Sequence, residues 1–368
     1  MMRSIGIGII GGGYMGKAHA VAYNAVASVF NTALKPRLEM VCARTRESAE
    51  HYQQAYGFNS ATDDWRELVS NPSVEAVIIA SPQATHKEIA LAAFEANKHV
   101  FCEKPLGASL EDATIMTKAA TTSGLVHMIG FNYIRTPATQ FIRQLVQQKA
   151  IGDLVWFRGE HTEDFYANPE LPASWRAENR ASGTMGDLAP HMINAALAIC
   201  GPVRQVMADI ETVHKQRPGG QVKNDDQAHC MVRFDNGCMG HLFFSRVSHG
   251  RKMGYCYEIT GTKGAIRFDQ EDQNCFWLYK AEGDEATRGF TKILTGPSHP
   301  DYLAFCQGAG HGTGYQDQII IEARDFLNAV EAGTPLWPDF SDGLAVSRIV
   351  DACFSSAETK SWVSISQN

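Results

Sequence analysis

The sequence of 368 residues lacks a long apolar run. The apolar stretch near its N-terminus, from Ile5 to Ile10, is interrupted by glycines and is too short for a signal peptide or a membrane span. Runs of Lys and Arg are also missing, and the net charge of -7 disfavours a nucleic-acid partner. We therefore expect a cytoplasmic protein that binds neither membranes nor nucleic acids.

The cysteines and histidines form no pattern typical of disulfides or metal sites. Nine cysteines are scattered along the chain without a C-x-x-C pair, which indicates reduced thiols in a cytosolic enzyme. The 13 histidines match no spacing typical of metal ligands. No metal cofactor is therefore predicted.

Length and pattern predict an α/β protein of two domains. The chain exceeds one ordinary core, and 44% hydrophobic with 20% charged residues is typical of globular proteins. From Ile5 to about residue 130, short apolar strands alternate with helices, which predicts a Rossmann-type, doubly wound parallel sheet. We expect this dinucleotide-binding domain to span residues 1–130.

After residue 130 the pattern changes to successive strands. Turn sequences such as Asp235-Asn236-Gly237 separate strands and predict hairpins. We expect residues 131–368 to form an α+β substrate domain with a mostly antiparallel, open sheet. The stretch from Gly283 to Gly314 shows no period and predicts a long loop. Two final helices, at about 316–332 and 342–356, can pack back on the first domain.

A glycine motif points to dinucleotide binding. Gly11-Gly12-Gly13-Tyr14-Met15-Gly16 has the form G-x-G-x-x-G, directly follows a predicted strand and directly precedes a predicted helix. In this context Gly11 permits the tight turn, Gly13 allows backbone to approach the pyrophosphate, and Gly16 lets the helix pack close to the strand. Tyr14 and Met15 lie within the motif and are expected at the cofactor. A glycine-rich turn without ligand is the alternative, which the strand–turn–helix context disfavours.

The end of the second predicted strand bears on the choice between NAD and NADP. An acidic residue there normally binds the ribose hydroxyls of NAD, but this strand ends in Ala43-Arg44-Thr45-Arg46. Arg44 can stack on adenine, and Arg44, Thr45 or Arg46 can bind a 2′-phosphate, which slightly favours NADP. Glu47 follows closely, so NAD stays open, as does an ordinary solvated turn.

Two further motifs carry candidate catalytic groups. Glu103-Lys104-Pro105 follows a predicted strand, at the edge where doubly wound sheets bind ligands, and places Lys104 beside the expected nicotinamide. Asp187 and His191 are four residues apart at a predicted helix start, where a carboxylate can orient an imidazole base. The alternatives are a surface Lys before a turn proline, and a helix cap with a packed His.

Taken in order along the chain, these motifs resemble those of one family. The chain resembles the Gfo/Idh/MocA oxidoreductases in four motifs. They are Gly11 to Gly16 with His19, Ser81-Pro82 with His86, Glu103-Lys104-Pro105, and Asp187-Leu188-Ala189-Pro190-His191. The resemblance implies that Lys104, Asp187 and His191 form the catalytic group. It also implies that Ser81, Pro82, His86 and Glu103 lie on the cofactor side, and that the bond before Pro105 is cis. The family's open sheet face commonly makes oligomer contacts, so a homodimer or homotetramer is expected.

Several other polar and aromatic residues are weaker candidates for the pocket. Two alternatives to a role in the pocket are an ordinary domain-junction loop around Asn132 and a core position for Trp175. We expect contacts with cofactor or substrate hydroxyls from Asn132, and with substrate from Tyr133, Glu160, Trp175, Arg176 and Tyr315, with His161 as a neighbouring candidate.

These features predict an NAD(P)-dependent dehydrogenase acting on CH–OH groups. It is expected to move a hydride between the nicotinamide and a secondary hydroxyl or carbonyl of a sugar, sugar derivative or cyclitol. One alternative is a glycoside hydrolase that retains NAD and oxidises the sugar only transiently. The other is a non-catalytic regulator that senses dinucleotide, which is expected to lack the Lys and His that this chain keeps at 104 and 191.

Overall fold

The computed structural model describes residues 3–366 and divides the chain into two compact units. The first unit runs to Arg135 and includes Gly314–Ala345, while the second comprises Thr136–Thr313 and the chain from Val346 onward. The first unit therefore extends beyond residue 130 and takes in one of the two C-terminal helices. Within residues 3–366, no helix is long and apolar enough to cross a lipid bilayer.

The first unit is built on a six-stranded sheet in which every pair of neighbours is parallel. The spatial order β3-β2-β1-β4-β5-β6 reverses between β1 and β4, which is the point where doubly wound sheets bind their ligands. The central strands are almost fully buried, as expected when helices cover both faces. The strands are β1 (Ser4–Ile10), β2 (Lys35–Cys42), β3 (Ser60–Thr62), β4 (Ala76–Ile79), β5 (His99–Glu103) and β6 (His127–Gly130).

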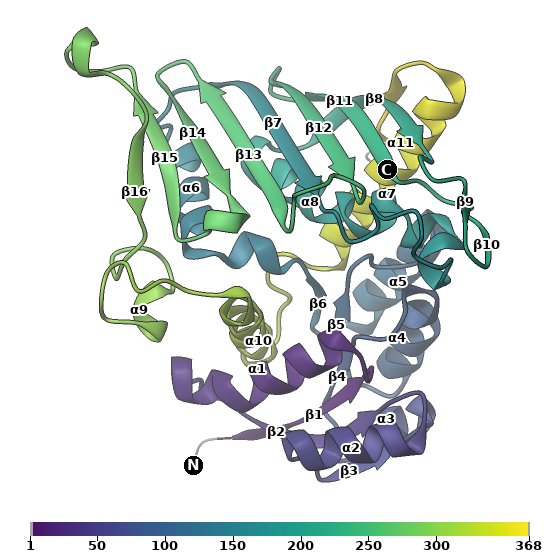
Figure 1. Cartoon of the computed structure of the whole chain (residues 1–368). Helices are drawn as coiled ribbons and strands as arrows, with labels where there is room; N and C mark the ends of the chain where they lie inside the picture. Colours follow the sequence, from purple (N-terminus) through teal and green to yellow (C-terminus); the bar gives the residue numbers. More distant parts are fainter. Residues whose placement is uncertain (1–2, 367–368) are drawn as a thin grey trace. The chain divides into compact units, whose positions relative to one another are not determined.

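The helices of this unit start at polar or glycine caps. The side chains of Thr45, Asp64 and Ser109 accept backbone N–H groups at three of these starts, and Gly57 ends one helix with a φ of 78°. Helix α10 lies beside α1, as Figure 1 shows. The helices are α1 (Tyr14–Phe30), α2 (Arg46–Tyr56), α3 (Trp65–Ser70), α4 (His86–Glu95), α5 (Leu110–Ser123) and α10 (Tyr315–Ala332).

The second unit is built on a nine-stranded sheet in the order β16-β15-β14-β13-β7-β12-β11-β8-β17. Its neighbours are antiparallel except for β7 and β12, so the predicted fold class is confirmed. The strands are β7 (Leu154–Thr162), β8 (Val203–Glu211), β11 (Gln227–Phe234), β12 (Met239–Ser245), β13 (Gly254–Gly261), β14 (Gly264–Asp269), β15 (Cys275–Lys280), β16 (Thr291–Leu294) and β17 (Val363–Ser364). Two short strands, β9 (Gln216–Arg217) and β10 (Gly220–Gln221), form a separate hairpin.

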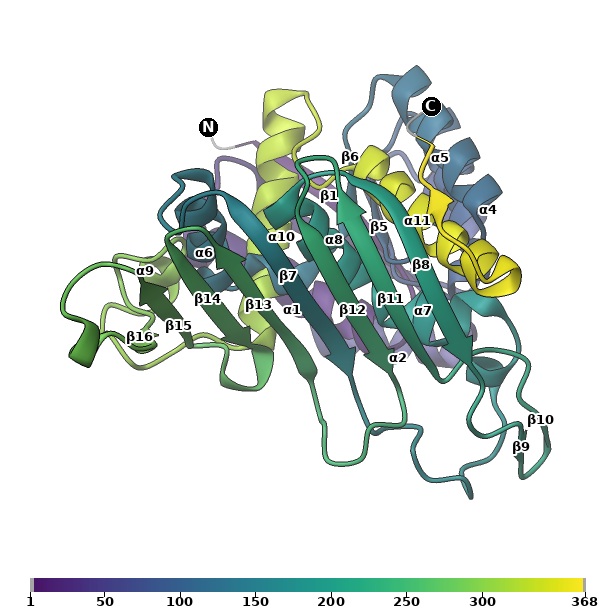
Figure 2. The same cartoon turned by 90° about the horizontal axis from the view of Figure 1, so that it is seen from above.

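Helices of the second unit cover one face of this sheet and leave the other face open, as Figure 2 shows. Along β7, Phe157 and His161 point to the covered face and are buried, while Arg158 and Glu160 point to the open face. The covering helices are α6 (Pro137–Gln147), α7 (Thr184–Asp187), α8 (Ala189–Cys200) and the second-unit part of α11 (Phe340–Thr359).

The segment predicted as a long loop, from Gly283 to Gly314, is more ordered than expected. It contains β16, which pairs with β15 so that Lys292 lies opposite Trp277, and a short helix α9 (Tyr302–Phe305). The prediction was wrong here because the partner strand, and not a local period, makes the backbone of β16 extended.

A buried carboxylate lies two residues before β11. Asp225 is 4% exposed, and its side chain accepts the backbone N–H of Met185 at 2.7 Å. Burial raises the pKa of this carboxyl from 3.8 to about 6, although Arg246 nearby opposes the shift. The folded chain therefore binds the Asp225 proton more tightly than the unfolded chain does.

We predict that Asp225→Asn flattens the pH dependence of stability. With a raised folded pKa, the stability contribution of Asp225 is full below pH ~4 and is lost as the pH rises through about 6. An Asn oxygen still accepts the Met185 N–H, so the variant should gain up to ~3 kcal/mol relative to wild type between pH 4 and pH 7. Urea unfolding at both pH values measures this difference. The exposed control Glu282→Gln should show no such trend, and an equal trend in both variants would contradict the assignment.

Candidate active site

The glycine loop after β1 is shaped for a phosphate ligand. A Cβ at Gly16 would lie 1.8 Å from the carbonyl oxygen of Gly11, and Gly11 has a φ of 139°. A Cβ at Gly13 would meet no atom within 4 Å, so open space lies beside the backbone there. Helix α1 begins after Gly13 without a side-chain cap and without an acidic residue in its first turn. These features fit the pyrophosphate of a dinucleotide, which the exposed N–H groups and the helix dipole attract.

The tip of β2 holds the three residues predicted to contact a 2′-phosphate. The Thr45 hydroxyl accepts the backbone N–H of Ser48 at 3.3 Å and so caps α2. The Arg46 guanidinium pairs with Glu50 at 2.8 Å on the exposed surface of the same helix. Both side chains are therefore engaged within α2, while Arg44 is exposed.

His86 joins the ends of two neighbouring strands. Its ring nitrogens lie 2.9 Å from the carbonyl oxygen of Ser81, after β4, and 3.0 Å from that of Pro105, after β5. The side chain is 1% exposed, and this burial lowers the pKa of its imidazole. His86 therefore links the two segments that carry Ser81 and Lys104.

The Glu103-Lys104-Pro105 motif ends β5 at the carboxyl edge of the sheet. The Lys104–Pro105 bond is cis, as the family resemblance implied. The Glu103 carboxylate is buried and lies 2.7 Å from Nε2 of His19 in α1, so it faces the interior. Lys104 is only partly buried at this edge.

Aromatic side chains surround the start of α10 in the first unit. The ring of Tyr315 stacks on Tyr14 at 5.8 Å and lies 6.2 Å from the ring of Tyr133. Its hydroxyl reaches the sulfur of Met15 at 3.3 Å, and burial raises its pKa. Tyr315 thus stands next to the glycine loop. Asn132 is buried and donates to Gln318 at 2.9 Å, within the interior of the unit.

A second group of candidate residues gathers in the second unit around α7 and α8. His191 is 5% exposed, and its ring lies edge-on to that of His161 at 5.7 Å. Nδ1 of His161 bonds the carbonyl oxygen of Leu188, the residue between α7 and α8, at 2.9 Å. Asp187 ends α7, so the helix start predicted at this pair is in fact a junction of two helices.

Arg176 and Asp187 are joined by an ion pair at 3.2 Å. The Arg176 guanidinium also stacks over Trp175 and Phe165, 4.5 and 5.2 Å from the ring centroids. Trp175 is 52% exposed, so the alternative of a core tryptophan is wrong. An exposed indole beside a partly buried arginine is an arrangement that suits a polar ring with hydroxyl groups.

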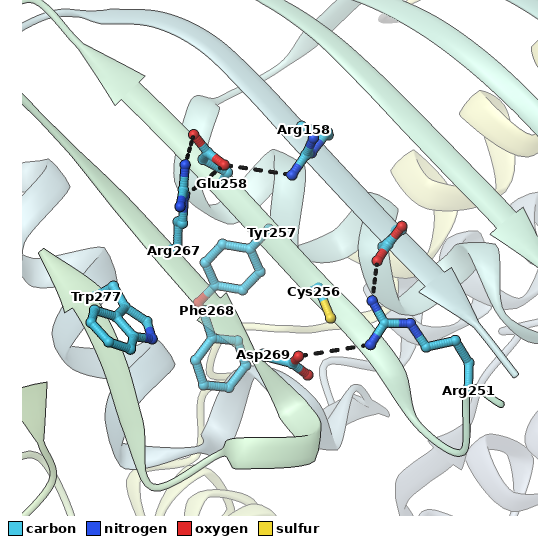
Figure 3. A pocket seen from close by; sticks show the side chains of 10 residues that line it. Arg158, Arg251, Cys256, Tyr257, Glu258, Arg267, Phe268, Asp269 and Trp277 are labelled. Carbon is cyan, nitrogen blue, oxygen red and sulfur yellow. Dashed lines mark hydrogen bonds and ion pairs between the residues drawn. The ribbon is translucent and has the colours of Figure 1, made fainter. Parts of the chain in front are cut away.

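Glu160 does not join this group. It lies on the open face of the sheet, where it pairs with Arg251 at 3.2 Å and lines a shallow hollow of about 280 Å³. Figure 3 shows that hollow, with Arg251 also directed at Asp269, and with Arg158 and Arg267 on either side of Glu258. The strand alternation places its neighbour His161, not Glu160, beside His191.

The sequence reasoning missed the residues that hold these groups in place. His19 was noted only as part of a motif, and Arg246 with Asn224 gave no signal, because their side-chain and backbone partners are distant in the sequence. Among residues 3–366, no three His, Cys, Asp or Glu side chains are grouped so as to hold a metal ion.

Comparison with known families matches both units. An oxidoreductase family domain with an NAD-binding Rossmann fold matches residues 5–131, and the GFO/IDH/MocA C-terminal domain matches residues 139–267. The chain belongs to the Gfo/Idh/MocA family. The prediction of an NAD(P)-dependent dehydrogenase acting on CH–OH groups is thereby confirmed.

Individual members of the Gfo/Idh/MocA family are similar over the whole chain. Levoglucosan dehydrogenase of Pseudarthrobacter phenanthrenivorans is 37% identical, over 100% of this chain and 99% of the relative. A structure of levoglucosan dehydrogenase with NADH and levoglucosan has a TM-score of 0.97 at 37% identity, with both chains fully covered. An NAD-binding oxidoreductase from Klebsiella pneumoniae has a TM-score of 0.95 at 35% identity, over 99% of this chain and 100% of the other.

We predict that Gly13→Ala weakens dinucleotide binding without loss of fold. The added methyl group meets no protein atom within 4 Å, and the φ of -107° suits alanine. It projects into the space where the backbone approaches the pyrophosphate, so the Kd for NADH should rise tenfold or more, about 1.4 kcal/mol. Fluorescence titration with NADH measures the change.

The matched control is Gly289→Ala in the second unit, where an added Cβ also meets no atom within 4 Å. Both variants should keep the wild-type Tm. Unchanged NADH affinity in Gly13→Ala would place the pyrophosphate elsewhere.

Proposed function

We propose that this protein oxidises a secondary hydroxyl of a sugar, sugar derivative or cyclitol with NAD. The observation that carries the proposal is the arrangement at the carboxyl edge of the first sheet. There the open glycine loop follows β1, and Lys104 follows β5. The next residue, Pro105, has its carbonyl oxygen in contact with the ring of His86. Sheets of this type bind dinucleotides at that edge, so Lys104 lies where the reactive end of the cofactor is expected.

The proposed substrate is an uncharged monosaccharide. A relative 37% identical over the full chain is a levoglucosan dehydrogenase, which supports an anhydrosugar or a pyranose as the first compound to assay. The exposed indole of Trp175 and the guanidinium of Arg176 supply a flat apolar surface and hydrogen-bond donors for such a ring. Asn132 stays a candidate for cofactor and substrate, and Tyr133 and Tyr315 stay candidates for the substrate. Glu160 is left out because it faces the open sheet surface.

The chemistry assigns proton handling to protein side chains. When bound, the oxidised nicotinamide supplies a hydride acceptor for the carbinol carbon. We infer that Lys104 and His191 are the two groups that take up and pass on the hydroxyl proton. Asp187 holds Arg176 in an ion pair, and His161 supports the turn at Leu188 that leads into the helix of His191.

The two alternative functions have less support. An NAD-retaining glycosidase would release no NADH during turnover, and a non-catalytic regulator would not need Lys104 or His191. The relatives with a stated activity include levoglucosan dehydrogenase, glucose-6-phosphate 3-dehydrogenase of Bacillus subtilis and myo-inositol 2-dehydrogenase of Thermotoga maritima, which favours net oxidation.

The charges near the tip of β2 favour NAD over NADP. Asp63 directly follows Thr62, whose carbonyl oxygen accepts the N–H of Ala43 at 3.2 Å, so the ends of β3 and β2 are adjacent. Burial is the main reason that the pKa of the Cys42 thiol rises to about 12, and the negative charges of Asp64, Asp63 and Glu67 add to this rise. A 2′-phosphate is repelled by these carboxylates, whereas a ribose hydroxyl can donate to one of them.

We further infer that the open face of the second sheet binds a second copy of the chain, giving a homodimer or homotetramer. Met231, Met239 and Trp277 are each at least 40% exposed on the open face of that sheet. Apolar side chains gathered on one sheet face are typical of subunit contacts. The mass of the particle in solution, from light scattering, decides between one chain and several.

We predict that Lys104→Ala and His191→Ala each lower kcat by ~100-fold or more, because each removes a group that handles the hydroxyl proton. The assay follows NADH absorbance with a panel of neutral sugars and cyclitols, levoglucosan included. NADH binding, measured by fluorescence, should persist in both variants.

The matched controls are Lys118→Ala and His249→Ala, which remove the same side chains from exposed positions. Both should keep wild-type kcat. Near-normal turnover in Lys104→Ala or His191→Ala would remove that residue from the catalytic group, and hydrolysis without NADH would support the glycosidase.

We predict that the wild type binds NADH ~10- to 100-fold more tightly than NADPH, because the carboxylates beyond β2 repel a 2′-phosphate. Asp63→Asn should narrow this ratio by improving NADPH binding, whereas the exposed control Glu95→Gln should leave it unchanged. Fluorescence titration with both reduced nucleotides measures it, independently of any sugar. Tighter binding of NADPH by the wild type would restore the NADP assignment.

A further inference from the structure

A buried arginine lies at the end of β12, behind the residues proposed to face the sugar. Arg246 is 1% exposed, although it is among the largest side chains of the protein. One of its nitrogens, Nη1, donates to the backbone carbonyl oxygens of Arg176 at 2.9 Å and of Ser182 at 3.1 Å. The guanidinium thus spans two points of a segment that contains only short helical turns.

Two side chains fix the orientation of this guanidinium. Nε of Arg246 donates to Asp226 at 2.9 Å, and Nη2 donates to Asn224 at 2.8 Å. Asp226 is fully buried and also accepts the backbone N–H of His214. Because every named partner is an oxygen and the ion pair is buried, the planar guanidinium has one favourable orientation.

The segment Asn224-Asp225-Asp226, which binds Arg246, also holds the start of α7. The backbone carbonyl of Asp225 accepts the N–H of Thr184 at 3.1 Å, and its side chain accepts that of Met185 at 2.7 Å. The hydroxyl of Thr184 donates to the carbonyl of Asp226 at 2.8 Å. The position of Asp187, two residues after Met185, is therefore tied to the segment that binds Arg246.

We propose that Arg246 is a positioning residue that fixes the place of the Arg176–Asp187 ion pair, which contacts the sugar. It anchors the backbone of Arg176 directly, and its partners Asn224 and Asp226 belong to the segment that anchors α7. The proposal rests on the proposed function, since the pair matters only if it faces substrate. Arg246 itself has no contact with the reacting groups assigned above and acts through Arg176.

Lysine cannot replace arginine in this role. A lysine ammonium is a single point of charge and cannot serve the Arg176 carbonyl, the Ser182 carbonyl, Asn224 and Asp226 in the observed fork. Arg246→Lys thus keeps the buried charge beside Asp226 and removes the link to the segment. Asn224→Ala is a second, milder variant, because Asn224 also donates to the carbonyls of Arg176 and Asn179 at 2.8 Å.

The experiment compares Arg246→Lys and Asn224→Ala with Ile266→Ala, a buried change that should lower stability in β14, where Ile266 pairs with Ile259 and Leu278. Hydrogen exchange should rise in residues 176–187 in the first two variants and stay at the wild-type rate there in Ile266→Ala. With the sugar that the wild type oxidises, KM should rise at least tenfold in Arg246→Lys, with the NADH Kd unchanged. In the background of Arg176→Ala, Arg246→Lys should add less than twofold to KM.

Each outcome bears on one of the two proposals. If the wild type oxidises no sugar, the proposed function fails, while the exchange data still decide whether Arg246 orders the segment. Unchanged exchange in residues 176–187 of a folded Arg246→Lys or Asn224→Ala overturns the positioning role. A full tenfold effect of Arg246→Lys in the Arg176→Ala background also overturns it, because Arg246 would then act by another route.

Discussion

The first unit depends on a close approach of α1 to the end of β1. A side chain is excluded from this contact, because a Cβ at Gly16 would lie 1.8 Å from the carbonyl oxygen of Gly11. A Cβ at Gly11 would lie 2.3 Å from the carbonyl oxygen of Ala80, which follows β4. The contact brings the start of α1 to the point where the strand order reverses. The segments after β4 and β5, which carry Ser81 and Lys104, reach the same edge because parallel strands end on one side of the sheet.

Buried polar side chains then hold the groups proposed for chemistry. His86 links the backbone after β4 to that after β5, and Arg246 links the segments before α7 to the end of β12. Each contacts backbone carbonyl oxygens, and a polar group that is buried without a partner costs ~1–3 kcal/mol. The same contacts therefore also restrict the backbone that carries Ser81, Lys104 and Arg176.

The candidate site was predictable from the sequence where a motif fixes the local backbone. The glycine motif and the Glu103-Lys104-Pro105 motif occupy the predicted strand ends, and the predicted family is confirmed. Prediction was weaker where the partner is distant in sequence. Glu160 was the expected substrate contact and His161 a neighbouring candidate, and only the packing of α8 against β7 shows which face of the strand meets His191. Likewise, Arg46 was a candidate for a 2′-phosphate, and only the structure shows that its guanidinium pairs with Glu50.

By itself, the sequence determined the two kinds of sheet, the dinucleotide loop and the residue types at the proposed catalytic positions. These follow from local rules, namely strand and helix periodicity, glycine at a close approach and motif spacing. Only the tertiary structure decided that β16 is a strand, that α10 belongs to the first unit, and that Arg246 underlies Arg176. Such choices depend on pairings between segments far apart in the chain, and the physical reason is that a hydrogen bond or a buried face has no local signature until its partner is in place.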